Sequence, residues 1–159
     1  MICSDQWKDY ELLDASDGER LERWGKYILI RPDPQVIWNE QKKHPLWSRA
    51  DASYRRSASG GGAWNENRLP ESWKVSYGNL NFKIKPMGFK HTGLFPEQAA
   101  NWDWMAQRIR KAEREIKVLN LFAYTGGATA ACAAAGASVV HVDAAKGMVQ
   151  QAKENMALS

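Results

Sequence analysis

Residues 118–143 read VLNLFAYTGGATAACAAAGASVVHVD, and this stretch decides the fold of the chain. The apolar run Val118–Phe122 is short enough to be a buried parallel strand. A turn that contains Gly126 and Gly127 follows it. Glycines in such a turn let the backbone approach a ligand at the start of the next helix. The pattern therefore predicts the first strand and turn of an α/β unit.

The second half of the stretch completes that unit. A small-residue helix is expected over Ala128–Ala135, and Gly136 would end it. A second buried strand, Ser138–Val142, then precedes Asp143. A carboxylate in this position can hold the hydroxyls of a ribose. Because the glycine spacing does not match G-x-G-x-x-G, the turn does not indicate a dinucleotide site.

Length and composition indicate a globular protein. The 159 residues suffice for one ordinary domain or two small ones. The hydrophobic content of 44% and the charged content of 25% are typical of soluble proteins. The acidic N-terminus is not a signal peptide, and no run is apolar enough to span a membrane. Cys3 and Cys132 lack partners at metal or redox spacing, so we expect a cytoplasmic protein without a metal site.

Charge is distributed unevenly around the net value of +4. Residues 42–68 contain six Lys or Arg against two acids, whereas residues 5–22 contain seven acids against two bases. Arginines that alternate with aromatic residues suit RNA, because guanidinium groups bind phosphate and rings stack on bases. The expected RNA contacts are Arg49, Arg55, Arg56 and Arg68. A solvated surface loop is the alternative interpretation.

The region before residue 89 is predicted to be rich in β-strands. Tyr10–Arg31 suggests a strand, a turn and a strand, and Val36–Trp38 suggests another short strand. Residues 39–72 appear polar and irregular, and the Ser/Gly-rich stretch 57–62 is expected to be flexible. Trp73–Pro86 has the alternation of a hairpin around a two-residue Gly78-Asn79 turn. All eight tryptophans lie at or before Trp104, so we predict domains at 1–88, with a flexible basic loop at 42–68, and 89–159.

Two amphipathic helices are expected around the α/β unit. The first begins at Pro96 and runs to about Arg114. Its apolar stripe comprises Ala99, Trp102, Met105, Ala106, Ile109 and Ala112. The second runs from Ala145 to about Leu158. Its inner face comprises Ala145, Met148, Val149, Ala152 and Met156.

Longer strings point to a family. The glycine turn and Asp143 resemble class I S-adenosylmethionine-dependent methyltransferases, in which such a turn lies under the methionine part of the cofactor. The strings LFPEQ at 94–98 and VLNLFAYTGG at 118–127 resemble the bacterial large-subunit rRNA cytosine-C5 methyltransferase family and its uncharacterised relatives. LERWG at 21–25 and RPDPQ at 31–35 resemble a subgroup of these relatives. The resemblance implies an N-terminal β-rich region followed by the first half of a Rossmann-like sheet.

The resemblance also implies a set of cofactor contacts. Asp143 would accept both ribose hydroxyls, with Ala144 beside the adenine, and Gln98 would reach the cofactor from the opposite wall. The residues along the methionine and adenosine side would be Phe122, Ala123, Tyr124, Thr125, Gly126 and Gly127. Each contact has a structural alternative. Phe122 and Tyr124 could be core aromatics, Gly126 could serve helix packing, and Gln98 could simply begin a helix.

The family's catalytic segments are expected beyond the end of this chain. In the resembled enzymes an Asp-Pro-Pro segment and a nucleophilic cysteine lie on later strands, and C5 methylation needs that thiolate. Neither Cys3 nor Cys132 matches that motif, so no catalytic residue is assigned. We therefore expect an N-terminal fragment that is inactive alone and that self-associates through its truncated sheet. The alternatives are a non-catalytic RNA-binding module and a fragment of a nicotinamide-dependent oxidoreductase.

Overall fold

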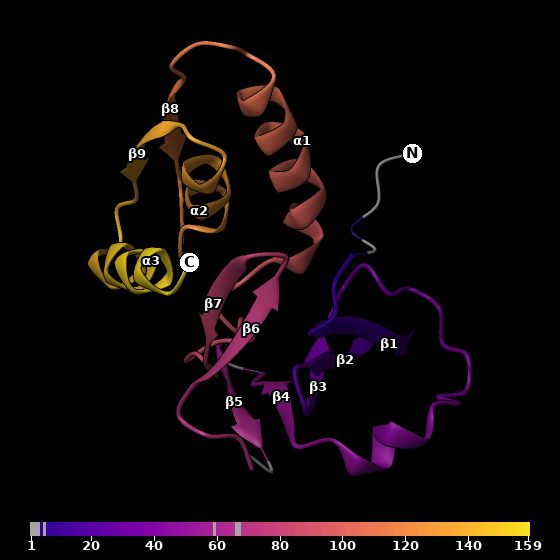
Figure 1. Ribbon diagram of the computed structural model, residues 1–159. Helices are drawn as coiled ribbons and strands as arrows, with labels where there is room; N and C mark the ends of the chain where they lie inside the picture. The colour runs from indigo at the N-terminus through magenta and orange to yellow at the C-terminus, as the bar shows by residue number, and fades with distance from the viewer. Residues whose placement is uncertain (1–3, 5, 59, 66–67) are drawn as a thin grey trace. The chain divides into compact units, whose positions relative to one another are not determined.

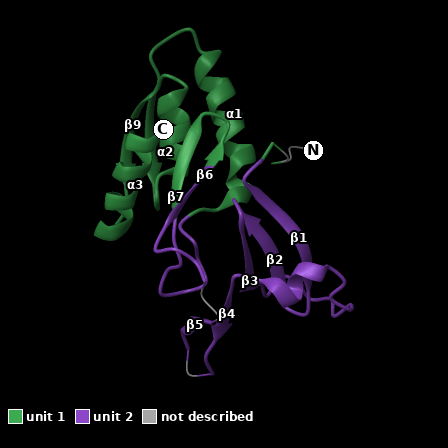
Figure 2. Cartoon of the chain, turned by 60° about the horizontal axis from the view of Figure 1, so that its bottom comes forward, with its two compact units in different colours: residues 1–7, 76–83, 94–159 green, residues 8–75, 84–93 purple. Residues whose placement is uncertain are grey.

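The computed structural model describes residues 4, 6–58, 60–65 and 68–159. The chain forms two compact units, which Figure 2 colours separately. Unit 1 comprises residues 1–7, 76–83 and 94–159, and unit 2 comprises residues 8–75 and 84–93. Each unit is therefore assembled from separate segments of the sequence. The predicted domains 1–88 and 89–159 stay a prediction.

Unit 2 is built on a five-stranded sheet whose strands follow the order of the chain (Figure 1). The strands are β1 (Tyr10–Ser16), β2 (Glu19–Trp24), β3 (Tyr27–Pro32), β4 (Ala52–Arg56) and β5 (Gly62–Asn65). Neighbouring strands are antiparallel except β3 and β4, which are parallel. The connection between these two contains the 3-10 helix η1 (Pro45–Arg49). One side of the sheet buries Leu21, Ile28 and Ala50 in a small apolar core.

Unit 2 departs from the sequence prediction in three places. A second tight turn at Gly25, with a φ of 64°, splits the predicted second strand into β2 and β3. Val36–Trp38 is not a strand, because the Val36 amide donates to the Asp33 carbonyl in a turn and the Ile37 side chain is 88% exposed. The stretch 39–72, predicted to be irregular, contains η1, β4 and β5.

Cys3, Ser59, Glu66 and Asn67 lie outside the described residues.

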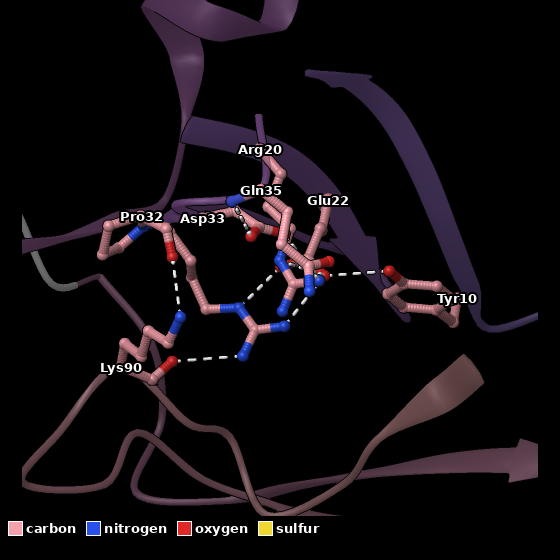
Figure 3. Close-up of polar contacts among 8 residues, drawn as sticks. Tyr10, Arg20, Glu22, Pro32, Asp33, Gln35 and Lys90 are labelled. Atoms are coloured by element: carbon pink, nitrogen blue, oxygen red, sulfur yellow. Dashed lines mark hydrogen bonds and ion pairs between the residues drawn. The ribbon is translucent and has the colours of Figure 1, made fainter. Parts of the chain in front are cut away.

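A buried ion pair lies on the β2–β3 part of this sheet (Figure 3). The Arg31 Nε donates to Glu22 Oε2 at 2.6 Å, and a second guanidinium nitrogen donates to Oε1 at 2.8 Å. The two side chains are 2% and 0% exposed. The Tyr10 hydroxyl donates to Glu22 Oε1 at 2.9 Å, and Arg31 donates to the Lys90 carbonyl at 3.1 Å. The pair is thus bidentate, and each partner makes a further hydrogen bond, Glu22 with Tyr10 and Arg31 with the Lys90 carbonyl.

The hairpin prediction for residues 73–86 is confirmed. Strands β6 (Trp73–Tyr77) and β7 (Leu80–Ile84) pair through a turn at Gly78-Asn79, and Gly78 has a φ of 57°. The predicted apolar positions of the two strands are buried or half-buried, and Lys74 is exposed. The hairpin contributes residues to both units.

Unit 1 contains the predicted order of strand, turn, helix and strand. Its further elements are η2 (Pro96–Gln98), α1 (Ala99–Arg110), β8 (Lys117–Leu121), α2 (Gly127–Ala134), β9 (Ser138–Val142) and α3 (Lys146–Leu158). The strands β8 and β9 are parallel, with Lys117 opposite Ser138. Helix α2 contacts both strands and also α1 and α3. Among the described residues, no helix has the length and apolar character needed to cross a membrane.

Three details of unit 1 differ from the prediction. The strands are not buried on both faces, because alternate side chains remain in solvent: Leu119 is 62% and Val140 60% exposed. Helix α1 ends at Arg110 instead of continuing to about Arg114, and Glu113 has a positive φ of 49°. The buried residues of α3 are Gln151, Ala152 and Asn155, whereas Met156 is 37% exposed.

Candidate functional site

The turn between β8 and α2 has an unusual backbone. Phe122, Tyr124 and Gly126 have φ angles of 53°, 51° and 84°. Two of them are non-glycine residues in the left-handed region, which L-residues seldom adopt. The Ala123 amide donates to the Val142 carbonyl and the Gly126 amide donates to the Ala123 carbonyl, both at 3.0 Å. Such conformations persist where surrounding contacts enforce them, and they concentrate at functional sites.

Asp143 ties the end of β9 to this turn. One carboxylate oxygen accepts from the Tyr124 amide at 2.8 Å, and the other accepts from the Ala145 amide at 2.9 Å. The bonds from Ala145 and Tyr124 lower the pKa of the Asp143 carboxyl. An ionised carboxylate has about four acceptor positions. Asp143 can therefore hold the turn in place and still accept hydrogen bonds from a ligand.

The N-terminus of α2 packs directly on an indole ring. A Cβ atom built on Gly127 would lie 2.6 Å from a ring carbon of Trp102. Trp102 is only 4% exposed and comes from the buried stripe of α1. Glycine is therefore required at the first residue of α2 because a larger residue would displace the ring or the helix. This contact fixes the helix end, where free amide groups and the helix dipole favour negative groups.

A cavity of about 430 Å³ opens beside the turn. This volume falls in the usual range of small-molecule sites. Six of the residues expected at the cofactor line it: Gln98, Phe122, Ala123, Tyr124, Thr125 and Gly127. The further lining residues are Leu94, Phe95, Glu97, Trp102, Asn120 and Ala128. The Phe122 side chain is 92% exposed, so the alternative that it is a core aromatic is wrong.

Gly126, Asp143 and Ala144 do not line the cavity. Gly126 is buried, and a Cβ atom on it would lie 3.0 Å from the Cβ of Ala152 in α3. Its position fits the alternative that it serves packing. Gln98 is the N-cap residue of α1, and its Oε1 accepts from the Asn101 side chain at 2.9 Å. The cofactor contacts of all nine residues stay predictions.

Comparison with known proteins identifies the family. Residues 35–159 match the S-adenosylmethionine-dependent methyltransferase family. The chain belongs to this family. The cofactor of the family is therefore S-adenosylmethionine, as the resemblance implied.

Individual methyltransferases resemble the chain over part of their length. A ribosomal RNA large subunit methyltransferase K/L from Magnetococcus marinus is 37% identical over 133 residues, which are 83% of this chain and 16% of the relative. One of the same name from Shewanella frigidimarina is 37% identical over 95 residues, which are 59% of this chain and 13% of the relative. A crystal structure of an S-adenosylmethionine-dependent methyltransferase from Agrobacterium tumefaciens is 40% identical with a TM-score of 0.88, and the match covers 96% of this chain and 49% of that one.

These matches confirm the fold class predicted for the chain, with a β-rich N-terminal region before the first half of a Rossmann-like methyltransferase sheet. The chain spans less than half the length of each of these relatives. The family match favours a methyltransferase over the two alternative functions, an RNA-binding module and a nicotinamide-dependent oxidoreductase.

The cavity fits the methyltransferase cofactor in its chemistry. An apolar wall at Phe122 suits a flat base, and Asp143, outside the lining but bonded to the turn residue Tyr124, has a carboxylate that suits ribose hydroxyls. Sequence reasoning missed Trp102 and Asn120 as lining residues. The Asn120 side-chain amide donates to the Thr129 hydroxyl at 2.9 Å. The same hydroxyl lies 2.9 Å from His141 Nδ1. The sequence feature that could have indicated Asn120 is its amide, a polar group inside the apolar run Val118–Phe122.

Replacing Gly127 with alanine is expected to lower stability by about 1–3 kcal/mol, the cost of forcing an extra methyl group into a packed contact. The reason is the 2.6 Å approach to Trp102. Urea unfolding followed by circular dichroism measures the change. The control is Gly147→Ala in α3, where a Cβ atom meets nothing within 4 Å. That variant should gain up to about 1 kcal/mol, and equal losses in both variants would contradict the packing argument.

Proposed function

We propose that the chain forms the S-adenosylmethionine-binding part of a methyltransferase that acts on RNA of the large ribosomal subunit. The observation that carries this proposal is the cavity beside the strained turn after β8, with Asp143 at the end of β9. In open α/β sheets ligands bind at the carboxyl ends of the strands, where this turn lies. The RNA part is supported by the two similar proteins that are ribosomal RNA large subunit methyltransferases.

The residues of the cavity lining and those of the neighbouring turn and the end of β9 divide the binding task. Asp143 would accept the ribose hydroxyls through its remaining lone pairs, with Ala144 beside the adenine. Gln98 would reach the cofactor from the opposite wall, while Phe122 would cover it and exclude water. The turn residues Ala123, Tyr124, Thr125, Gly126 and Gly127 would contribute backbone contacts. When bound, S-adenosylmethionine supplies a methyl group that its sulfonium centre activates.

Changing Asp143 to asparagine tests the site. The variant keeps the shape of the side chain but replaces one acceptor oxygen with a donor, which would oppose a backbone amide or a ribose hydroxyl. Calorimetric titration of the 159-residue chain measures the affinity for S-adenosylhomocysteine. This affinity should fall roughly 10- to 150-fold in the variant, since hydrogen bonds to charged groups contribute about 1.5–3 kcal/mol.

The matched control is Glu115→Gln, which removes an exposed carboxylate that precedes β8. It lies toward the amino end of that strand, away from the turn. The Glu115→Gln variant should bind S-adenosylhomocysteine with the same affinity as the unchanged protein. Equal affinities for all three proteins would sink the assignment of Asp143.

Transfer to cytosine C5 is the finer part of the proposal and is supported by the sequence resemblance. The chemistry requires a thiolate. Cys132, the cysteine that the described residues contain, is 2% exposed, and burial raises the pKa of its thiol. Its sulfur contacts Met105 at 3.8 Å, as expected of a core residue. C5 transfer would therefore need a cysteine outside the described residues.

The RNA contacts and the self-association also remain proposals. Arg49, Arg55 and Arg56 are exposed in unit 2, at η1 and at the end of β4, as contact with a polyanion requires. Arg68 is exposed, and its amide donates to the Asp51 carbonyl at 2.9 Å. Self-association would use the side chains on the open face of β8 and β9, which are Leu119, Leu121, Val140 and Val142. The cytoplasmic location belongs to the same proposal.

A further inference from the structure

Helix α1 carries two different faces. The buried one contains Ala99, Trp102 and Ala106. The other contains Trp104, Gln107 and Arg108 and continues into the C-cap residue Lys111, and we call these four residues the α1 stripe. Their spacing of three, four and seven residues places them one above another on a helix. All four are exposed.

Trp104 dominates the α1 stripe. Its side chain is 50% exposed, and the Arg108 guanidinium lies 5.4 Å from the centre of its ring. A tryptophan held in water beside an arginine is uncommon on a surface without a partner, because both residue types are enriched in binding interfaces. We call this pair, with the guanidinium over the ring, the platform.

The charge around this platform is positive. Between Trp104 and Ala112 the sequence contains Arg108, Arg110 and Lys111 and no acid. The nearest carboxylate on the helix, Asp103, accepts a hydrogen bond from the Tyr77 hydroxyl. The helix dipole favours cations near a C-terminus. The dipole does not explain why Trp104, about one and a half turns before the end of the helix, is exposed. The exposed ring beside these cations therefore requires another explanation.

Two hollows adjoin Trp104. One, of about 470 Å³, is lined by Gln107, Arg108 and Lys111 as well as the ring. The other, of about 540 Å³, lies on the side of Asp103 and Arg110. The first hollow is basic, and the second contains Arg110 and Lys111 beside Asp103. A flat ring next to such cations suits one unpaired base with its phosphates.

We propose that the α1 stripe binds single-stranded RNA. One base stacks on Trp104, Arg108 and Lys111 take the neighbouring phosphates, and Gln107 bonds a base edge. The inference rests on the proposed RNA substrate and adds a contact surface in unit 1. Because Trp102 of the same helix lines the cofactor cavity, one rigid element positions both the RNA and the methyl donor.

The test is binding of a labelled RNA of about ten unpaired nucleotides, a length within the usual site sizes, to the whole chain by fluorescence anisotropy. Trp104→Ala should weaken binding roughly 5- to 150-fold, the range for loss of one stacked base. Trp104→Phe keeps a ring and should recover part of the affinity. Lys111→Gln should reduce the slope of log affinity against log salt by about 0.7.

The matched control is Arg114→Gln, which removes the same charge beyond the end of α1. It should reduce the salt slope less than Lys111→Gln. Calorimetric titration with S-adenosylhomocysteine should give the same affinity for every variant. RNA binding by Trp104→Ala equal to that of the unchanged chain would overturn the inference, as would a parallel loss of cofactor affinity. If no RNA binds to any protein while the cofactor does, the RNA surface is wrong and the cofactor site stands.

Discussion

Replacing Glu22 with alanine is expected to destabilise the protein by about 3–5 kcal/mol, the usual cost of leaving a buried charge without its partner. Arg31, which is 2% exposed in the unchanged protein, would lose its two bonds to the carboxylate. Urea unfolding followed by circular dichroism and by tryptophan fluorescence measures the change. Trp24, 5.4 Å from the Arg31 guanidinium and fully buried, makes unit 2 visible in the fluorescence signal.

Two further variants test the physical cause. In Glu22→Leu/Arg31→Met both charges are replaced by apolar groups of similar size, and most of the lost stability should return. Glu11→Ala removes the exposed pair with Arg23, which has an N–O distance of 3.1 Å and a carboxylate that is 56% exposed. It should cost less than about 1 kcal/mol. A double variant as unstable as Glu22→Ala would show that side-chain shape, and not charge, is decisive.

The same pair gives the protein a pH dependence. Burial alone would raise the pKa of the Glu22 carboxyl, but the charge and hydrogen bonds of Arg31 outweigh burial and lower it. A lowered folded-state pKa means that the pair contributes its full stability above the ordinary value of 4.5 and loses it as the pH falls through the folded-state value. Glu22→Ala should therefore show a weaker decline in stability below pH 4.5 than the unchanged protein.

Replacing Asn155 with leucine should lower the free energy of unfolding by about 2–4 kcal/mol, because two backbone groups would be left without partners. Asn155 is 0% exposed in α3. Its Oδ1 accepts from the Lys83 amide and its Nδ2 donates to the Thr125 carbonyl, both at 2.8 Å. The side chain thus joins strand β7 to the turn that borders the cavity.

The Asn155 variant should also bind S-adenosylhomocysteine less tightly, because the Thr125 backbone would lose its anchor. Thermal unfolding and calorimetric titration measure the two effects. The control is Gln150→Leu, an exposed amide on the same helix, which should change stability by less than about 0.5 kcal/mol. A loss of stability without any loss of affinity would mean that the anchor does not shape the cavity.

The α/β unit could be predicted from sequence because its signals are local. The two glycines and the small-residue helix after Phe122 specify strand, turn and helix without reference to the rest of the chain. The hairpin was predictable for the same reason, since Gly78-Asn79 lies between two alternating strands. Both predictions rest on residues that are neighbours in sequence.

The errors arise where distant segments decide the outcome. The inner face of α3 contains Gln151 and Asn155, because their amides bond the backbone of Lys83 and Thr125. An apolar stripe alone could not reveal this. Strand β4 includes the charged pair Arg55 and Arg56, so its sequence resembles a loop until β3 and β5 pair with it. The sequence predicts Trp102 only as part of an apolar stripe, whereas its contact with Gly127 and its place in the cavity lining depend on the fold.

Because the segments of the two units alternate in the sequence, the ribosome completes the two units at different times. Every segment of unit 2 has been synthesised once residue 93 is added, whereas unit 1 also needs residues 94–159. At about 5–20 residues per second, that leaves a delay of roughly 3–13 seconds. Until residue 102 is added, early in this interval, Trp7 and Phe82 lack Trp102, the ring against which both later pack. The nascent chain therefore carries a finished sheet unit beside exposed aromatic segments, a state that favours chaperone capture before the cofactor site exists.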